Sequence, residues 1–276
     1  MILSIITINY NNRDGLQKTI DSVLCQTWQD FEWIIIDGGS TDGSKELIEQ
    51  YQEHFVYWCS EPDKGIYNAM NKGIAKAKGD YLNFMNSGDY YCSDSSLQNV
   101  FSRPIPQITG IIYGNYYDVY NSGYREEQLL KDNLDICDLL YRPINHQSTF
   151  IRRNLLADIG YDESFYLLAD WKAFVQWMIS GQEFYHVNTF VACFEMGGIH
   201  SLQDNQKQQE ITRIRQEVVP YRLLLVCDDL HAIRCESERF PEIKAVINIY
   251  GKNNIIRFVL KFCIRLSNYL WRIRHF

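Results

Sequence analysis

The first 85 residues alternate between two hydrophobic periods, and this alternation constrains the fold more than any other feature. Continuous apolar runs at 2–8, 31–36, 56–60 and 81–85 predict buried strands, and apolar residues recur at helical spacing between them. Strands buried on both faces and joined by helices are typical of parallel sheets with right-handed connections. We therefore expect an α/β fold with a Rossmann-like, mostly parallel sheet flanked by helices.

Each of these four strands is followed by a polar segment. The segments read NYNNRDG, DGGSTDGS, EPDKG and NSGD in chain order. Because parallel strands place their carboxyl ends at one edge of a sheet, the four segments are expected to line one ligand site.

The alternation stops after Phe101, which divides the chain into three parts. We expect a first half at 1–101, a second half at 102–203 and a helical extension at 204–276. The second half is predicted to contain short strands at 110–113, 116–120, 147–152, 182–187 and 190–194. The extension is predicted to begin with one helix over 204–226, followed by an acidic bend over 227–242.

Charge is distributed unevenly along the chain. The formal net charge is -7, yet the last acidic residue is Glu242, and seven basic residues follow it. The body is therefore strongly acidic and is not expected to bind nucleic acid. The tail at 254–276 combines a basic stripe with apolar residues, which favours contact with an anionic membrane surface over a buried helix.

The cysteine pattern indicates a reducing compartment. Eight cysteines are scattered without a C-x-x-C pair or metal-ligand spacing, so we expect reduced residues that lie mostly in the core. No secretory signal and no apolar run of spanning length are found. We therefore expect a cytoplasmic protein that lies peripherally at the inner face of the cytoplasmic membrane through its tail.

Two carboxylates at strand ends are candidates for ligand binding. Asp37 follows the second strand and, with glycines after it, can accept hydrogen bonds from a nucleobase or ribose. Asp89 follows the fourth strand and can ligate a hard divalent cation that neutralises a diphosphate. Both residues also suit plain turns, because aspartate is a common turn former.

Several segments together resemble family 2 glycosyltransferases with the GT-A fold, especially those that build bacterial O-antigen and capsular polysaccharides. They are TINYNN, IIIDGGSTDGS, EPDKGIYNAMNKGIAKAKGDYLNFMNSGD, HQSTFIRR and LLADW. The resemblance covers residues 1–201. It implies a GT-A catalytic domain at 1–203, with a nucleotide-sugar-binding half at 1–101 and an acceptor half at 102–203.

The resemblance also implies a nucleotide-sugar site. Its residues would be Thr7, Asn9, Asp37, Asp63, Lys64 and Asn86. Asn71 and Gly73 match the N-K-G segment of the family and would support this pocket. The donor would be a nucleotide-diphospho-sugar, with a UDP-sugar as the first expectation.

By the same resemblance, Asp89 would ligate Mg²⁺ or Mn²⁺. The two acids of the family's D-x-D motif fall here on Asn86 and Gly88, which leaves Asp89 as the sole carboxylate of the segment. His200 in GGIHS would complete the metal shell, since imidazole suits manganese better than magnesium. The alternative for His200 is an ordinary histidine in a surface loop.

Asp170 matches the catalytic base of the family. An inverting displacement needs a base to take the proton of the acceptor hydroxyl and a stabilised leaving group on the other face of the sugar. The alternative is that Asp170 caps the helix that follows it. For His146, which lies in the HQSTFIRR segment, a buried structural role is expected.

The expected function is inverting transfer of a sugar to an acceptor hydroxyl, with a lipid-linked glycan of cell-surface polysaccharide synthesis as acceptor. Two alternatives are a sugar nucleotidyltransferase and a carbohydrate-binding protein that kept the fold and lost catalysis. The first would need a glycine-rich, lysine-bearing loop after the first strand, and NYNNRDG contains one glycine. The carbohydrate-binding alternative stays open, because the segment that matches the D-x-D motif contains one carboxylate.

Overall fold

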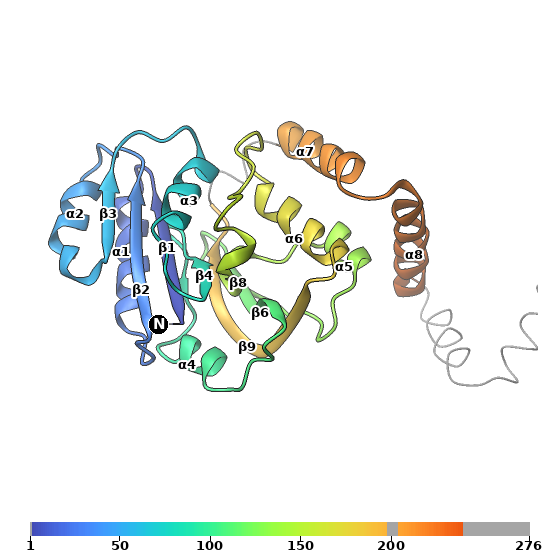
Figure 1. Cartoon of the computed structure of the whole chain (residues 1–276), viewed down its shortest axis with the longest axis horizontal. Helices are drawn as coiled ribbons and strands as arrows, with labels where there is room; N and C mark the ends of the chain where they lie inside the picture. Colours follow the sequence, from blue (N-terminus) through green and yellow to red (C-terminus); the bar gives the residue numbers. More distant parts are fainter. Residues whose placement is uncertain (1, 198–203, 240–276) are drawn as a thin grey trace, which may run out of the picture. The chain divides into compact units, whose positions relative to one another are not determined.

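The computed structural model describes residues 2–197 and 204–239, in which nine strands form one mixed sheet (Figure 1). The strand order is β3-β2-β1-β4-β8-β6-β9-β5, and β7 pairs with β6 at the side of this path. The strands are β1 Leu3–Asn9, β2 Phe31–Asp37, β3 Tyr57–Ser60, β4 Tyr81–Phe84, β5 Tyr90–Tyr91, β6 Thr109–Val119, β7 Arg125–Gln128, β8 Thr149–Arg152 and β9 Glu183–Glu195.

The four strands predicted in the first 85 residues are all present and pair in parallel. β1 lies between β2 and β4, and β3 pairs with the outer side of β2. The residues of β1, β2 and β4 are buried on both faces, as the continuous apolar runs predicted, whereas β3 at the edge of the sheet is half-buried. Asn9 lies directly opposite Asp37 in the register, so the carboxyl ends of β1 and β2 finish at the same level.

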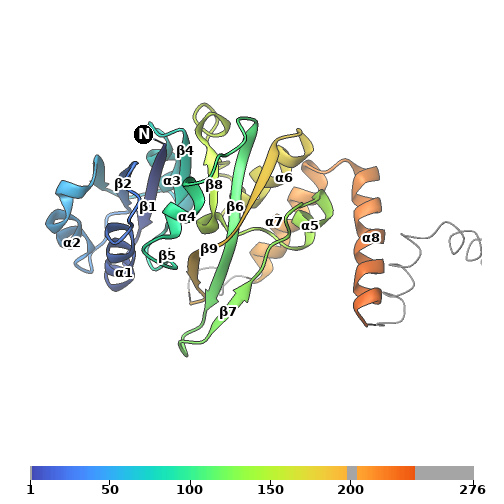
Figure 2. The ribbon, with the colours of Figure 1, turned by 90° about the horizontal axis from the view of Figure 1, so that it is seen from below.

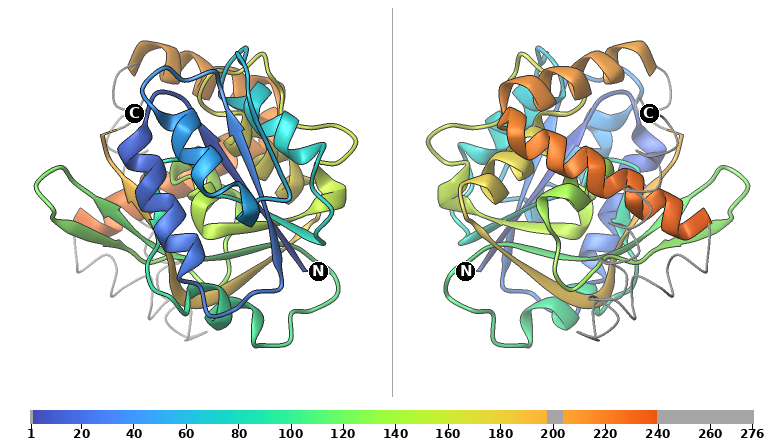
Figure 3. Two further views of the ribbon diagram at one scale, coloured as in Figure 1. Left: turned by 90° about the vertical axis from the view of Figure 1, so that its left-hand side faces the viewer. Right: turned by 90° about the vertical axis from the view of Figure 1, so that its right-hand side faces the viewer.

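Helices cover the two faces of this parallel part. The helices of the first half are α1 Arg13–Leu24, α2 Ser44–Gln50, α3 Ile66–Ile74 and α4 Ser96–Phe101, with the 3-10 turn η1 at Gln52–His54. The inner faces of α1 and α2 share a core cluster with Ile5 and Ile35, and Figure 3 shows these two helices side by side on the sheet. The opposite face carries α3, where Gly73 lies against Ile6 and Ile36.

Beyond β4 the sheet is mixed, and two pairs of predicted strands merge into single long ones. The segments 110–113 and 116–120 form β6, and the segments 182–187 and 190–194 form β9. These two strands run parallel with register irregularities around Gly114, so the polar residues between the predicted pairs do not end them. A turn at 121–123 joins β6 to β7 at the end of a projecting hairpin (Figure 2).

The remaining elements surround β8. They are α5 Ile136–Tyr141, η2 His146–Ser148, η3 Arg153–Leu155 and α6 Ala169–Ile179. The strand predicted at 147–152 is therefore shorter, because its first residues form η2 instead. Gly181 ends α6 as expected, with a positive φ of 82°.

Two helix boundaries have local causes. Ser44 is the first residue of α2, and the N-cap is Gly43 at a φ of 92°. The cause is local, because Asp42 accepts hydrogen bonds from both the backbone N–H and the hydroxyl of Ser44. The helix predicted over 204–226 is interrupted before Tyr221 at Pro220, a residue that cannot donate to the preceding turn.

Two helices replace this predicted one, α7 Asp204–Glu217 and α8 Tyr221–Arg239. The acidic bend expected from residue 227 is wrong up to residue 239, since α8 continues through it. The first compact unit extends to Tyr221, and a second unit begins at Arg222. Within the first unit, Glu210 of α7 accepts backbone N–H bonds from Tyr166, Leu167 and Leu168.

Among the described residues, no helix is both long and apolar enough to cross a bilayer. None of the seven described cysteines forms a disulfide. Three of them are buried and two are exposed, so the expectation that they lie mostly in the core is only partly met.

Candidate active site

The loop after β2 is organised around Asp37. Its Oδ1 accepts hydrogen bonds from Asn9 Nδ2 (2.7 Å) and Ser40 Oγ (2.6 Å), and its Oδ2 from Ser60 Oγ (2.6 Å) and the Ser40 backbone N–H (3.0 Å). Burial raises the pKa of this carboxyl, but the donors on Ser40, Ser60 and Asn9 outweigh burial, so the pKa lies below its ordinary value.

These four hydrogen bonds bear on the predicted role of Asp37. A carboxylate offers about four lone-pair sites, and Asp37 is fully buried. A nucleotide can therefore contact this side chain only after one of the present donors leaves. In this structure Asp37 links the ends of β1, β2 and β3 through its hydrogen bonds. Its influence on a ligand is therefore indirect, through the loop after β2 that these bonds hold in place.

The predicted contacts on β1 differ in depth. Thr7 is fully buried, and its hydroxyl accepts a hydrogen bond from Trp33 Nε1 (3.0 Å), so it lies beneath the rim in the core. Asn9 lies at the end of the strand, and its Oδ1 has no hydrogen-bond partner among the described residues. Such an unpaired buried acceptor is uncommon and marks Asn9 as a candidate ligand contact.

The loop after β3 lies beside the Asp37 loop. A side chain at Gly38 would approach both the Asp63 carboxylate (3.2 Å) and the Tyr10 ring (3.1 Å). Asp63 forms an ion pair with Lys72 of α3 (2.6 Å), and Lys64 next to it is exposed. Tyr10 is 66% exposed, so an aromatic ring is accessible at this rim. It is not among the site residues that the sequence motifs indicated.

Asp89 lies in a more buried position than a strand-end ligand was expected to occupy. It is 6% exposed, and its oxygens accept hydrogen bonds from Gln147 Nε2 (2.5 Å) and the Glu195 backbone N–H (3.0 Å). Burial raises its pKa to about 6, against the lowering effect of these donors. Asp89 thus joins the turn after β4 to η2 and to the end of β9.

Asp170 lies in the first turn of α6 and is not the N-cap, which is Leu168. Its Oδ1 accepts a hydrogen bond from the Tyr67 hydroxyl (2.7 Å), and its Oδ2 lies 2.7 Å from His146 Nδ1. The side chain is 13% exposed. The capping alternative is therefore excluded here, and a carboxylate held by two donors remains in reach of solvent.

His146 connects Asp170 to the turn after β4. Its Nε2 lies 3.0 Å from Asn86 Nδ2, while Nδ1 faces Asp170. We call this arrangement of Asn86, His146, Asp170 and Tyr67 the polar chain. His146 is buried, as expected, and its contacts join Asp170 to the turn after β4.

The polar chain brings two of the three expected carboxylates together. Gln147, which binds Asp89, directly follows His146, which binds Asp170. The third carboxylate, Asp37, is linked to them indirectly. It binds Asn9, and Asn12, three residues after Asn9, donates from Nδ2 to the Ser87 carbonyl (2.9 Å). These contacts thus link the loops that carry Asp37 and Asp89 to the first turn of α6, which carries Asp170, at the carboxyl edge of β1, β2 and β4.

Within the described part of the chain, no three His, Cys, Asp or Glu side chains group as a metal site. The donor set at Asp89 nevertheless fits a cation with few protein ligands. Mg²⁺ commonly takes one or two carboxylates and completes its shell with water and phosphate oxygens. The amide oxygens of Asn86 and Gln147, both buried and without a hydrogen-bond partner in the described residues, add hard donors near this carboxylate. His200 lies outside the described residues.

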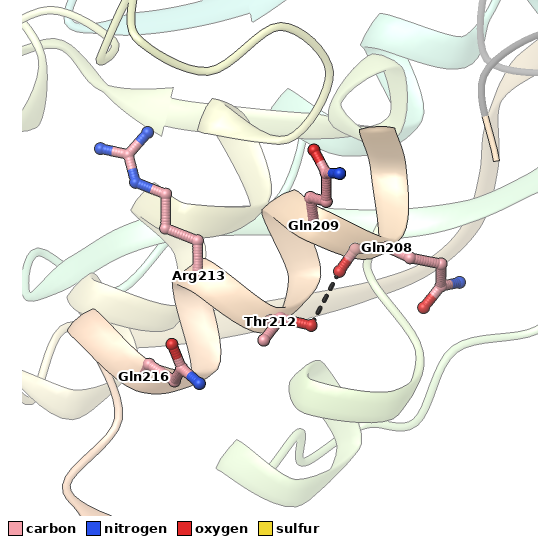
Figure 4. A pocket seen from close by; sticks show the side chains of 5 residues that line it. All are labelled: Gln208, Gln209, Thr212, Arg213 and Gln216. Carbon is pink, nitrogen blue, oxygen red and sulfur yellow. Dashed lines mark hydrogen bonds between the residues drawn. The ribbon is translucent and has the colours of Figure 1, made fainter. Parts of the chain in front are cut away.

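The hollow drawn in Figure 4 is separate from these residues. It lies along α7 and is lined by Gln208, Gln209, Thr212, Arg213 and Gln216. Its lining contains no carboxylate and none of the residues of the polar chain.

The family model for glycosyl transferase family 2 matches residues 4–161, which is more than half of the chain. The chain belongs to this family. The resemblance found in the sequence motifs is therefore confirmed, and the matched range contains the β1, β2, β3 and β4 loops together with His146.

Curated family members match parts of the chain. The uncharacterized glycosyltransferase Rv1514c of Mycobacterium tuberculosis is 35% identical over 184 residues, which cover 61% of this chain and 65% of the relative. The putative teichuronic acid biosynthesis glycosyltransferase TuaG of Bacillus subtilis is 38% identical over 98 residues, or 34% of this chain and 38% of TuaG. The chain thus spans less than two thirds of these relatives.

Solved glycosyltransferases share the fold. TarS 1-349 of S. aureus in complex with UDP-GlcNAc superposes with a TM-score of 0.64 at 16% identity, covering 82% of this chain and 66% of that one. The mannosyltransferase PcManGT from Pyrobaculum calidifontis, in complex with GDP-Man and Mn²⁺, gives 0.61 at 12% identity, covering 97% and 80%. The GT-A fold expected from the sequence is therefore confirmed.

Proposed function

We propose that this family 2 protein transfers a sugar, with inversion, from a nucleotide-diphospho-sugar to an acceptor hydroxyl. The arrangement of Asp170 carries this proposal. Two donors hold its carboxylate, it remains partly exposed, and it lies at the edge where the Asp37 and Asp89 loops meet. A base beside a strand-edge ligand site is what an inverting displacement requires.

The nucleotide is proposed to bind over the ends of β1 and β2. Asn9 Oδ1 can accept a hydrogen bond from the nucleoside, and the exposed ring of Tyr10 offers a stacking surface. Asp63 and Lys64 lie on the neighbouring loop, where a lysine can pair with phosphate oxygens. Asp37 and Thr7 support this pocket from beneath.

The diphosphate is proposed to lie beside Asn86 and Asp89. Asp89 would hold a divalent cation here, and such a cation would supply positive charge that stabilises the leaving group. Asp89 is the ligand that the described residues provide, with the amide oxygens of Asn86 and Gln147 near it.

Asp170 is the proposed base. The acceptor oxygen attacks the anomeric carbon from the face opposite the diphosphate, its proton moves to Asp170, and the bond to the diphosphate oxygen breaks. No covalent enzyme intermediate is needed, because one displacement inverts the anomeric centre. Positioning of acceptor and donor supplies much of the rate acceleration in such a reaction.

A lipid-linked glycan of cell-surface polysaccharide synthesis is the proposed acceptor. The name of TuaG places that relative in teichuronic acid biosynthesis, which supports this class of product. The tail at 254–276, outside the described residues, has a composition suited to an anionic membrane surface. We place the protein at the inner face of the cytoplasmic membrane on that basis.

The first test is a panel of UDP-, GDP- and dTDP-sugars with calorimetry and mass spectrometry of the products. We expect one donor to bind more tightly with Mn²⁺ and to release a nucleoside diphosphate. Release of pyrophosphate from a sugar phosphate and a nucleoside triphosphate would instead indicate a nucleotidyltransferase. Sugar binding that ignores both nucleotide and metal would indicate a carbohydrate-binding protein.

Asp170→Asn tests the base. We expect turnover to fall by about 10²- to 10⁴-fold, because an amide cannot take the acceptor proton, while calorimetry shows unchanged nucleotide binding. Asp158→Asn is the matched control, since Asp158 is an exposed carboxylate on the loop before α6. Near-normal transfer by Asp170→Asn would exclude the assignment.

A further inference from the structure

Both ring nitrogens of His146 are engaged in the polar chain. Nδ1 faces a carboxylate oxygen of Asp170 at 2.7 Å, and Nε2 faces the amide nitrogen of Asn86 at 3.0 Å. An ionised carboxylate only accepts hydrogen bonds, and an amide nitrogen only donates them. With the Asn86 amide in this orientation, Nδ1 donates to Asp170 and Nε2 accepts from Asn86, which selects the Nδ1–H tautomer.

The contact with Asn86 decides which member of the His146–Asp170 pair is the base. A histidine oriented by a carboxylate can itself act as the base through its other nitrogen. Here that nitrogen is occupied by Asn86 Nδ2, and the histidine side chain is 8% exposed against 13% for Asp170. The acceptor proton therefore goes to Asp170.

We propose that His146 is a positioning residue for the Asp170 base and that Asn86 sets its tautomer. This inference rests on the proposed function, because it assigns the support of the base named there. Nδ1–H and the Tyr67 hydroxyl hold the two carboxylate oxygens from different sides. These two contacts fix the orientation of the carboxylate, which an in-line attack requires.

The other titratable groups around Asp170 do not disturb this arrangement. Tyr67 comes from α3, and Tyr161 comes from the loop before α6. Burial, then the charge of Asp170, raises the pKa of each phenol well above its ordinary value. Both tyrosines stay protonated near neutral pH, so Tyr67 remains a donor to the carboxylate.

The tautomer can be read directly, without knowledge of the substrate. Nitrogen-15 NMR of histidine-labelled full-length protein distinguishes the Nδ1–H form from the Nε2–H form, and His146→Asn identifies the His146 signals among six histidines. We expect the Nδ1–H form, and we expect Asn86→Ala to abolish this preference. An Nε2–H form, or the same tautomer in Asn86→Ala, would overturn the inference.

Kinetics separate positioning from mere structural support. In His146→Leu we expect turnover to fall by about a hundredfold, with nucleotide affinity unchanged. The acid side of the pH–rate profile should move to higher pH, because a carboxylate that loses a donor is protonated more readily. His146→Asn should restore part of the rate, since its amide nitrogen can replace Nδ1.

His186 provides the matched control. Its Nδ1 contacts Asp132 (2.7 Å) and its Nε2 lies near Asn115 Oδ1 (3.3 Å), so it forms a similar grouping outside the polar chain. His186→Leu should leave the pH–rate profile unchanged. If Asp170→Asn is inactive but His146→Leu keeps the wild-type rate and profile, this inference fails alone. If Asp170→Asn is active, both this inference and the assignment of Asp170 as the base are wrong.

Discussion

At the scale of single residues, the three carboxylates of the site differ in how they are held. Asp37 is satisfied by four donors, Asp170 is held by two donors and stays partly exposed, and Asp89 is buried with a raised pKa. The pKa of Asp37 is lowered and that of Asp89 is raised, so these two carboxylates respond differently to protonation. Their separate roles follow from these surroundings, since the side chains are chemically identical.

Asp89→Asn should change the pH dependence of stability. The pKa of Asp89 is raised from 3.8 to about 6 in the folded protein, so the folded state binds this proton more tightly than the unfolded chain. The resulting stabilisation is fully present below pH 3.8 and is lost as the pH rises through 6. The asparagine variant has no such proton. Its free energy of unfolding should therefore rise relative to that of the wild type by on the order of 1 kcal/mol between pH 5 and pH 8.

Denaturant unfolding with a chelator present measures this difference. Asp162→Asn is the control of opposite sign. Burial raises the pKa of Asp162, but hydrogen bonds from Lys172 and Ser164 outweigh it and lower the pKa to about 2. The free energy of unfolding of Asp162→Asn should fall relative to that of the wild type as the pH rises through the acidic range. A pH-independent difference for Asp89→Asn would show that Asp89 titrates normally.

At the scale of elements, the site depends on how α3 is joined to the loop before α6. Asn71 of α3 donates to the Tyr161 carbonyl (2.9 Å) and to Glu163 (2.9 Å), and it accepts from the Tyr161 N–H (2.7 Å). The same helix carries Tyr67, which binds Asp170. The N-K-G segment, expected to support the nucleotide pocket, thus joins α3 to the loop before α6, the helix that carries Asp170.

Asn71→Ala should destabilise the protein by about 2–4 kcal/mol, because it leaves the N–H and C=O of Tyr161 without their partners. Asn68→Ala is the matched control. Asn68 lies one turn earlier on α3 and also contacts Glu163 (3.0 Å), but its bonds are exposed. We expect a loss below about 1 kcal/mol for that variant by thermal unfolding. Equal losses for both would mean that Asn71 is not the link between these elements.

At the scale of the whole chain, the first compact unit includes α7. Glu210 accepts three backbone N–H bonds from residues 166–168, immediately before α6. Without α7 these donors would be unsatisfied next to the helix that carries Asp170. The expected extension therefore does not lie in one unit, since its first helix belongs to the first compact unit.

Two truncations test this boundary. A chain ending at Tyr221 should melt near the temperature of the full chain, whereas one ending at residue 203 should be destabilised by several kcal/mol. The longer truncated chain also tests the membrane proposal, because it lacks the basic tail. Co-sedimentation with anionic liposomes should be lost in this truncated chain. Co-sedimentation of the full chain should fall with added salt. Equal pelleting of both proteins would exclude contact through the tail.

The sequence by itself determined the parallel β1–β4 sheet, its covering helices, the polar edge and the family. These follow from local periodicity and from motifs, which are readable along the chain. It did not determine that β6 and β9 are continuous, because two long paired strands can pass through polar positions that end an isolated run.

Only the tertiary structure decided how the site residues pair. Asp170 meets Tyr67 across 103 positions and His146 across 24, while Asp89 meets Gln147 across 58. Such pairs depend on where separate elements cross, and no local pattern of residues encodes that position. The burial of Thr7, Asp37 and Asp89 is of the same kind, since solvent exposure is a property of the assembled sheet and loops.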